Sequence, residues 1–236
     1  MIRVGGGPDM GMAGEDIEYC GLVYPHGDEI SKHMAQRLES EPFYQSDKLQ
    51  QALAVTKNRR TAIDCGAWVG GWSREIAKHF ERVLAIEANP DSARCVVKNV
   101  ARMPNVAVLN AALGERSGQT WVGRDATGPN VASRVGDEGH GVGCFVQAAR
   151  LDDVVEAMSD IAAVDYIKIH VNGMELKVLR GAAATIKRHR PVLTVVLKPA
   201  LESYGDSVAA ARTFLMSELG YKVAAGERPY EIWVPE

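Results

Sequence analysis

Short apolar runs alternate with amphipathic segments from Thr61 to the end of the chain. Runs such as VLAI at 83–86 have the length of buried strands, whereas residues 71–80 carry apolar side chains at helical spacing. Strands that alternate with helices indicate βαβ crossovers, so we expect an α/β fold with a mainly parallel sheet. The pattern predicts strands at 61–65, 83–87, 106–110, 144–149, 164–170, 192–197, 221–225 and 230–234, and helices at 46–55, 71–80, 90–101, 151–158, 173–188 and 206–219.

Residues 61–90 combine a strand, a glycine-rich turn, a helix and a second strand, and an acid closes each strand. Gly66 and Gly70 let the backbone turn sharply and come close to a ligand. The start of the helix offers N–H groups to an anion, here a carboxylate. Asp64 ends the first strand. Glu87 lies about twenty residues past Gly66, where nucleotide-binding folds place the acid that accepts hydrogen bonds from ribose hydroxyls.

The glycine spacing distinguishes between nucleotide ligands. The order Asp64-x-Gly66-x-x-x-Gly70 differs from the G-x-G-x-x-G of dinucleotide-binding proteins, which disfavours a nicotinamide-dependent oxidoreductase. An acid two residues before the first glycine suits a cationic amino group rather than a pyrophosphate. S-adenosylmethionine has such an amino group, a carboxylate and an adenosine, but no phosphate. The alternative is a plain βαβ unit whose glycines only permit tight packing.

The last two predicted strands are separated only by residues 226–229. This loop is too short for a crossover helix, so the two strands are expected to pair antiparallel. A parallel sheet that ends in an antiparallel hairpin is typical of methyltransferases rather than dehydrogenases.

The chain of 236 residues fits one α/β domain at 59–236 with an extension at 1–58. In the extension we expect a mobile tail, a short strand at 17–24 and two helices, at 31–40 and 46–55, with Ser46 as the N-cap of the second. The extension is a candidate contact in a homodimer. Residues 111–143 predict a ragged hairpin with a long loop, whose candidate ligand groups are Asn130, Ser133 and Arg134.

Composition excludes several classes of function. The net charge of −3 argues against a strongly basic nucleic-acid or membrane surface. The chain has no apolar run of the roughly 18–20 residues that cross a bilayer, and its first residues lack the apolar core of a signal peptide. The four cysteines show no C-x-x-C spacing, so we expect no metal site and no disulfide framework, and a cytoplasmic protein with reduced thiols.

The stretch VDYIKIHVNGME at 164–175 is the second informative segment. Its strand ends at His170, and Gly173 turns the chain into a helix. Residues at the carboxyl end of a parallel strand face the ligand crevice, so we expect His170 and Asn172 over the reactive end of the cofactor. Glu175, in the first helical turn, is either a site residue or a cap that the helix dipole favours. We predict His170, Asn172 and Glu175 as the catalytic group.

Six ordered motifs resemble those of the FkbM-type S-adenosylmethionine-dependent methyltransferases, over roughly Thr61 to Val234. The motifs are IDCGAWVGGWS, LAIEANP, VLNAALGERSG, ARLDDVV, VDYIKIHVNGMELKVLRGA and RPVLTVVLK. The resemblance implies a Rossmann-like class I methyltransferase fold with a mainly parallel seven-stranded sheet, an antiparallel C-terminal hairpin and an N-terminal helical extension. It implies S-adenosylmethionine as cofactor. Its methionyl part would be held by Asp64, Gly66, Ala67 and Gly70. Its ribose would be bound by Glu87, and its adenine would lie near Asn110 and Ala111.

The chain departs from the family at three acidic positions. The family usually reads I-D-V-E-G-x-E, whereas this chain has His170 and Asn172 at the first two acids and keeps only Glu175. Leu197 and Lys198 stand where the family has an acid after the next strand. Histidine is a competent base near neutral pH and can replace the missing acid. Lys198 can instead bind an anionic substrate.

The resemblance implies methylation of a hydroxyl, often on a sugar, so the expected partner is a small-molecule acceptor, with carbohydrate as the leading class. Two alternatives stay open. The changed acids are also what a non-catalytic S-adenosylmethionine-binding or scaffold protein would show. Modification of nucleic acid is the weaker alternative. It is suggested by similar proteins in bacteriophage genomes and by the basic run at 187–190, which a helix end explains equally well.

Overall fold

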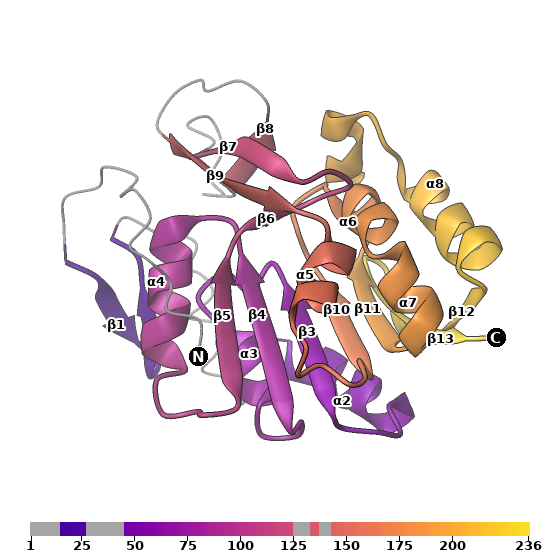
Figure 1. Cartoon of the computed structure of the whole chain (residues 1–236), viewed down its shortest axis with the longest axis horizontal. Helices are drawn as coiled ribbons and strands as arrows, with labels where there is room; N and C mark the ends of the chain where they lie inside the picture. Colours follow the sequence, from indigo (N-terminus) through magenta and orange to yellow (C-terminus); the bar gives the residue numbers. More distant parts are fainter. Residues whose placement is uncertain (1–14, 27–44, 125–132, 137–142) are drawn as a thin grey trace.

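A seven-stranded sheet forms the centre of the computed structural model, which describes residues 15–26, 45–124, 133–136 and 143–236 (Figure 1). The strand order is β12-β13-β11-β10-β3-β4-β5. The strands are β3 (Thr61–Cys65), β4 (Arg82–Glu87), β5 (Val106–Asn110), β10 (Tyr166–Ile169), β11 (Val192–Val196), β12 (Tyr221–Glu227) and β13 (Tyr230–Pro235).

The five neighbouring strands β11, β10, β3, β4 and β5 pair parallel. Strand β13 pairs antiparallel with both β11 and β12. The predicted parallel sheet with an antiparallel C-terminal hairpin is therefore confirmed. Strands β3, β10 and β11 are buried along their whole length, which explains their continuous apolar runs. The insertion of β13 between β11 and β12 did not follow from the sequence pattern.

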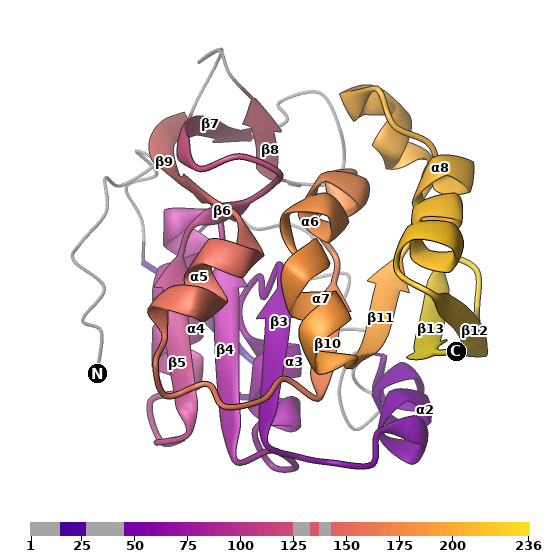
Figure 2. The same ribbon diagram turned by 45° about the vertical axis from the view of Figure 1, so that its right-hand side comes forward.

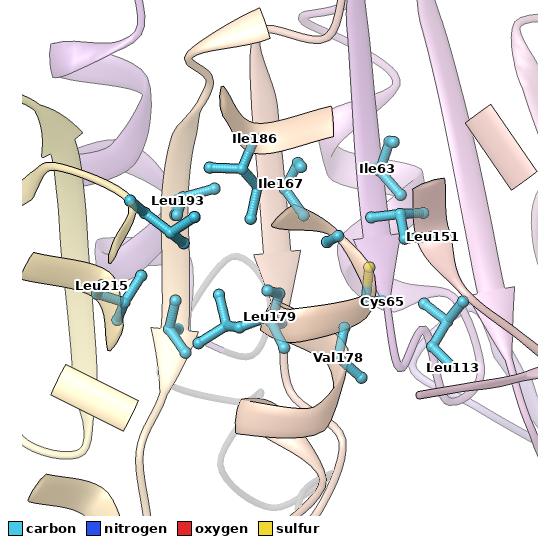
Figure 3. Close-up of a cluster of buried hydrophobic side chains, with 14 of the residues drawn as sticks. Ile63, Cys65, Leu113, Leu151, Ile167, Val178, Leu179, Ile186, Leu193 and Leu215 are labelled. Carbon is cyan, nitrogen blue, oxygen red and sulfur yellow. The ribbon is translucent and has the colours of Figure 1, made fainter. Parts of the chain in front are cut away.

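Helices cover both faces of the sheet. They are α2 (Ser46–Val55), α3 (Gly71–Ile76), α4 (Pro90–Asn99), α5 (Leu151–Ala157), α6 (Glu175–Gly181), α7 (Ala183–His189) and α8 (Val208–Thr213), with a 3-10 helix η1 (Pro199–Tyr204) and a π-helix η2 (Phe214–Glu218). The core of Figure 3 joins the sheet residues Ile63, Ile167 and Leu193 to residues of α5, α6, α7 and η2. On the other face, α2 and α3 pack on Ala62 and Tyr166, and α4 packs on Ala85.

Three predicted helix features were wrong. Helix α3 ends at Ile76 rather than at residue 80, and turns follow it. The helix predicted at 173–188 is two helices with Ala182 between them. Beside this break, a Cβ on Gly181 would lie 1.9 Å from the carbonyl oxygen of Gly114, so the chain is in tight backbone contact there. Ser46 is the first residue of α2 and not its N-cap, which is Gln45 in the left-handed region without a side-chain cap.

The N-terminal segment predicted as one strand is a hairpin of β1 (Ile17–Tyr19) and β2 (Leu22–Tyr24). Its turn residues Cys20 and Gly21 both have positive φ. Asn99 of α4 fastens the hairpin to the domain, because its side chain accepts from the N–H of Val23 and donates to the carbonyls of Val23 and Val69. The helix predicted at 31–40 and most of the predicted tail lie outside the described residues, and the boundary at 58/59 stays a prediction.

A second, four-stranded sheet has the order β6-β9-β7-β8 and lies above the carboxyl ends of β3 and β4 (Figure 2). Its strands are β6 (Ala112–Leu113), β7 (Gly118–Arg124), β8 (Ser133–Gly136) and β9 (Gly143–Ala149). The ragged hairpin predicted at 111–143 is thus part of a sheet. Ser133 and Arg134 begin β8 rather than lie in a loop, and Asn130 falls outside the described residues. No helix in the described ranges is long and apolar enough to cross a membrane.

Candidate cofactor and acceptor site

The glycine turn between β3 and α3 is pressed against the end of β10. Gly66 and Gly70 have φ values of +81° and +83°, in the region that favours glycine. A Cβ on Gly66 would lie 2.0 Å from the carbonyl oxygen of His170. Both conformation and space therefore require glycine at position 66. This contact places the turn, where the cofactor is expected, directly beside the histidine predicted to be catalytic.

A buried ion pair between β10 and β3 fixes the position of this turn. Lys168 of β10 donates to Asp64 Oδ1 at 2.7 Å and to the carbonyl oxygen of Gly66 at 3.0 Å. Ser73 donates to Asp64 Oδ2 at 2.7 Å. Because the Asp64 side chain is fully buried and both of its oxygens are engaged, it positions the turn. Its direct contact with an amino group of the cofactor stays a prediction.

The sequence pattern did not lead us to predict Lys168 as a residue of the site. The available signal was a lysine inside the apolar strand YIKI, a placement that is costly unless the charge is paired. Only the parallel register of β10 with β3, which sets Lys168 opposite Asp64, identifies its partner.

Glu87 lies at the carboxyl end of β4, where its two oxygens accept backbone hydrogen bonds. Oε2 accepts from the N–H of Trp68 in the glycine turn at 2.7 Å, and Oε1 accepts from that of Asn89 at 2.9 Å. Burial raises the pKa of Glu87 to about 7, although these hydrogen bonds oppose the shift. Each oxygen keeps a second lone pair, so the side chain can still accept from ribose hydroxyls.

The other residues predicted to hold the cofactor meet at the same edge. Asn110 at the end of β5 donates from Nδ2 to the carbonyls of Glu87 and Ala88, at 2.8 and 3.0 Å. Ala111 donates its N–H to the Glu87 carbonyl at 3.1 Å, and Ala67 donates to that of Ile86 at 3.0 Å. The amide of Asn110 thus ties β5 to the end of β4, and its predicted place beside the adenine stays a prediction.

His170 follows β10 and points toward β11. Its backbone N–H donates to the Cys65 carbonyl at 3.0 Å, and its Nε2 lies 3.0 Å from Nζ of Lys198. The ring packs edge-on against Tyr230 with centroids 6.0 Å apart. Burial, and then the charges of Lys198 and Lys168, lower the pKa of His170 well below its ordinary value. The imidazole is therefore neutral at pH 7, and in the tautomer that is protonated at Nδ1 its Nε2 accepts from the Lys198 ammonium group.

Lys198 lies at the carboxyl end of β11 and is partly buried. Burial lowers its pKa, the charge of Glu175 opposes this shift, and Lys168 adds to it. Its Nζ also lies 5.9 Å from the centroid of the Tyr230 ring, whose hydroxyl accepts a hydrogen bond from Gln45. Lys198, His170 and Tyr230 therefore form one cluster drawn from three strand ends.

Glu175 makes its hydrogen bonds within the loop after β10 rather than with that cluster. Its carboxylate accepts from the N–H groups of Val171 and Gly173 at 3.0 and 2.9 Å, and it closes the loop that leads into α6. Burial raises its pKa. Of the two predicted roles, this geometry favours the cap. Asn172 is exposed in the same loop, in the left-handed region with φ +52°, and its catalytic role stays a prediction.

No group of three or more His, Cys, Asp or Glu side chains in the described part of the chain could hold a metal ion. Cys65 is completely buried and burial raises the pKa of its thiol, which suits a small apolar residue rather than a nucleophile.

A groove of about 440 Å³ borders Met174, the residue that precedes α6. It lies between the second sheet and the start of α6, and its lining is mixed polar and apolar. The lining residues are 112–120, Ala148, Met174 and Lys177.

Comparisons with known proteins agree with this architecture. The chain is similar to methyltransferase FkbM from Methylobacillus flagellatus KT, with a TM-score of 0.50, 19% identity, and coverage of 75% of this chain and 43% of that one. It is also similar to the N-methyltransferase NodS from Bradyrhizobium japonicum WM9, solved with S-adenosyl-L-homocysteine, with a TM-score of 0.50, 13% identity, and coverage of 88% and 95%. At these identities the likeness shows the class I methyltransferase fold alone. No curated protein matches the chain.

The family model described as the methyltransferase FkbM domain matches residues 64–223. The match begins at Asp64 and includes the glycine turn, Glu87, His170 and Lys198. Because it covers more than half of the sequence, the chain belongs to the FkbM methyltransferase family.

Proposed function

We propose that this protein is an S-adenosylmethionine-dependent methyltransferase that acts on a hydroxyl of a small polar acceptor, with sugars as the leading class. The observation that carries the proposal is the contact of the glycine turn with His170, in a chain of the FkbM family. This contact brings the expected methionyl site and a candidate base to one edge of the sheet.

The residues present fit the cofactor. Gly66 and Gly70 adopt the positive φ values that shape the turn at the start of α3, and the oxygens of Glu87 can accept from ribose hydroxyls. Asn110 and Ala111 would border the adenine, and the buried pair of Asp64 and Lys168 keeps the turn in place. When bound, the cofactor supplies a methyl group that its sulfonium already activates.

Much of the catalysis in such a transfer comes from the alignment of the acceptor oxygen with the methyl carbon and sulfur. A general base adds about 10²- to 10⁴-fold. Neutral His170 is the candidate base, because Nε2 can take the hydroxyl proton once Lys198 no longer donates to it. The groove that borders Met174 has the volume and the mixed polar and apolar lining to admit a small polar molecule, and neither His170 nor Lys198 is among its lining residues.

A calorimetric titration with S-adenosylmethionine, followed by a panel of hydroxylated acceptors assayed for S-adenosylhomocysteine, tests the proposal. We expect cofactor binding, turnover with at least one acceptor, and a loss of about 10²- to 10⁴-fold in kcat for His170→Asn with cofactor affinity retained. Binding without turnover across a broad panel would favour the scaffold alternative. Absence of cofactor binding would overturn the proposal.

A further inference from the structure

The ammonium group of Lys198 has an unusual partner. The other lysine at this edge, Lys168, is paired with the carboxylate of Asp64, whereas Lys198 meets the ring nitrogen of a histidine. Within the described residues, no carboxylate lies within ion-pair distance of Lys198. An ammonium group has three donors, and the hydrogen bond to His170 uses one of them.

The acid whose charge acts on Lys198 does not compensate it by direct contact. The oxygens of Glu175 accept from the N–H groups of Val171 and Gly173, and the carboxylate makes no hydrogen bond or ion pair with Lys198, so it acts on Lys198 only through space. Lys168 adds positive charge to the same edge. A partly buried cation without an ion-pair partner is costly, and an anion placed beside it would lower that cost.

We propose that the acceptor carries an anionic group, a carboxylate or a phosphate, which binds Lys198 and so frees Nε2 of His170 for the acceptor hydroxyl. This inference rests on the proposed function and names its substrate class. It assigns Lys198 as a specificity-determining residue at the position where the chain departs from the acidic pattern of its family.

The two residues then act in sequence. The anion takes over the ammonium group, and the hydrogen bond between Lys198 and Nε2 of His170 is lost. With the cofactor bound, the acceptor oxygen would bond to the methyl carbon while the carbon–sulfur bond breaks and leaves its electron pair on sulfur, and Nε2 of His170 would take the hydroxyl proton. Solvent later takes that proton. A neutral acceptor would leave Lys198 on Nε2 and the base occupied.

The test follows the His170 imidazole by NMR in protein with labelled histidine, and His170→Asn assigns its signal. Sulfate is the probe because it stays divalent across the titration, and sodium chloride at equal ionic strength is the reference. We expect sulfate to raise the pKa of His170 saturably in the wild type. In Lys198→Gln the pKa should already be higher and should not respond to sulfate.

Lys187→Gln is the matched control, since it removes the same charge from an exposed position on α7 and should respond to sulfate as the wild type does. Lys198→Arg keeps the charge and should also respond, which guards against a folding defect in Lys198→Gln. Cofactor binding and thermal unfolding are measured on every variant.

An unchanged His170 pKa in wild-type protein that binds the cofactor would overturn the inference, as would an equal response in Lys198→Gln. Turnover of a neutral acceptor that Lys198→Gln does not impair would also refute it, while the proposed function stands. A sulfate response that depends on Lys198, in a protein with no turnover on any acceptor, would leave the anion site in place and refute the proposed function instead.

Discussion

Lys168 on β10 stands opposite Asp64 on β3, with its ammonium nitrogen 2.7 Å from the Oδ1 of that residue. The two side chains are 5% and 0% exposed, and the same ammonium group holds the carbonyl of Gly66. The pair therefore joins two central strands and the glycine turn. Loss of this pair should therefore lower the stability of the domain, and any effect on ligand binding can follow from that loss.

Removal of either partner should destabilise the domain strongly, because it leaves the other charge buried alone. We expect Lys168→Met and Asp64→Ala each to lower the free energy of unfolding by about 3–5 kcal/mol in urea denaturation. The double variant should lose less than the sum of the two. As a control, Arg82→Met removes an exposed pair with Asp160 and should cost about 0–1 kcal/mol. Additive losses would contradict a coupled pair.

A loss of stability in Asp64→Ala would also affect its binding of S-adenosylmethionine. If Asp64→Ala no longer binds S-adenosylmethionine, the cause is either a lost contact or a displaced turn. The stability of the same variant separates the two causes. A stable variant without binding would indicate direct contact.

Gly66→Ala should lower the free energy of unfolding by more than the strain of a positive φ alone would. The new Cβ would meet a backbone oxygen at 2.0 Å, which cannot move aside without a shift of β10. Gly205 is the matched control, since its φ is +77° and a Cβ there would meet nothing within 4 Å. Gly205→Ala should cost about 1–2 kcal/mol from conformation alone. Thermal unfolding should show a clearly larger loss for Gly66→Ala, and similar losses would refute the steric argument.

Glu87 should make the free energy of unfolding depend on pH. Its carboxyl ionises near 4.5 ordinarily and at about 7 in the fold, so between these values the folded state binds the extra proton. The stabilisation is fully present below pH 4.5, falls as pH rises, and is gone above about pH 7, a change of about 3 kcal/mol. In urea denaturation at several pH values, the difference between wild type and Glu87→Gln should follow this curve. A flat difference would contradict the raised pKa.

Glu175→Gln tests the cap against a catalytic role. The amide keeps one acceptor oxygen and directs N–H groups at a backbone N–H, so one of the two loop hydrogen bonds is lost. We expect the free energy of unfolding to fall by about 1–3 kcal/mol. Once an acceptor is known, kcat measured well below the unfolding temperature should change less than in His170→Asn. A full loss of kcat in a variant of normal stability would show instead that Glu175 acts in catalysis.

The order of the elements followed from the sequence because burial on both faces of a parallel strand leaves a continuous apolar run. The bounds of β3, β5 and α2 and the antiparallel end of the sheet were predicted this way and are confirmed. The breaks after Ile76 and at Ala182 were not predicted, because tight turns and backbone contacts ended the helices where the spacing of apolar residues did not.

At the candidate site, the sequence by itself determined which residues stand at strand ends, because one strand-end position can be read from one run of residues. It placed Glu87 and His170 there, and it marked Lys198 as a departure from the family. Only the tertiary structure decided the partners: Lys168 for Asp64, Lys198 for His170, and the backbone of its own loop for Glu175. Partners depend on the register between strands that are distant in sequence. That register is set by how crossovers pack on the sheet, which no local spacing encodes.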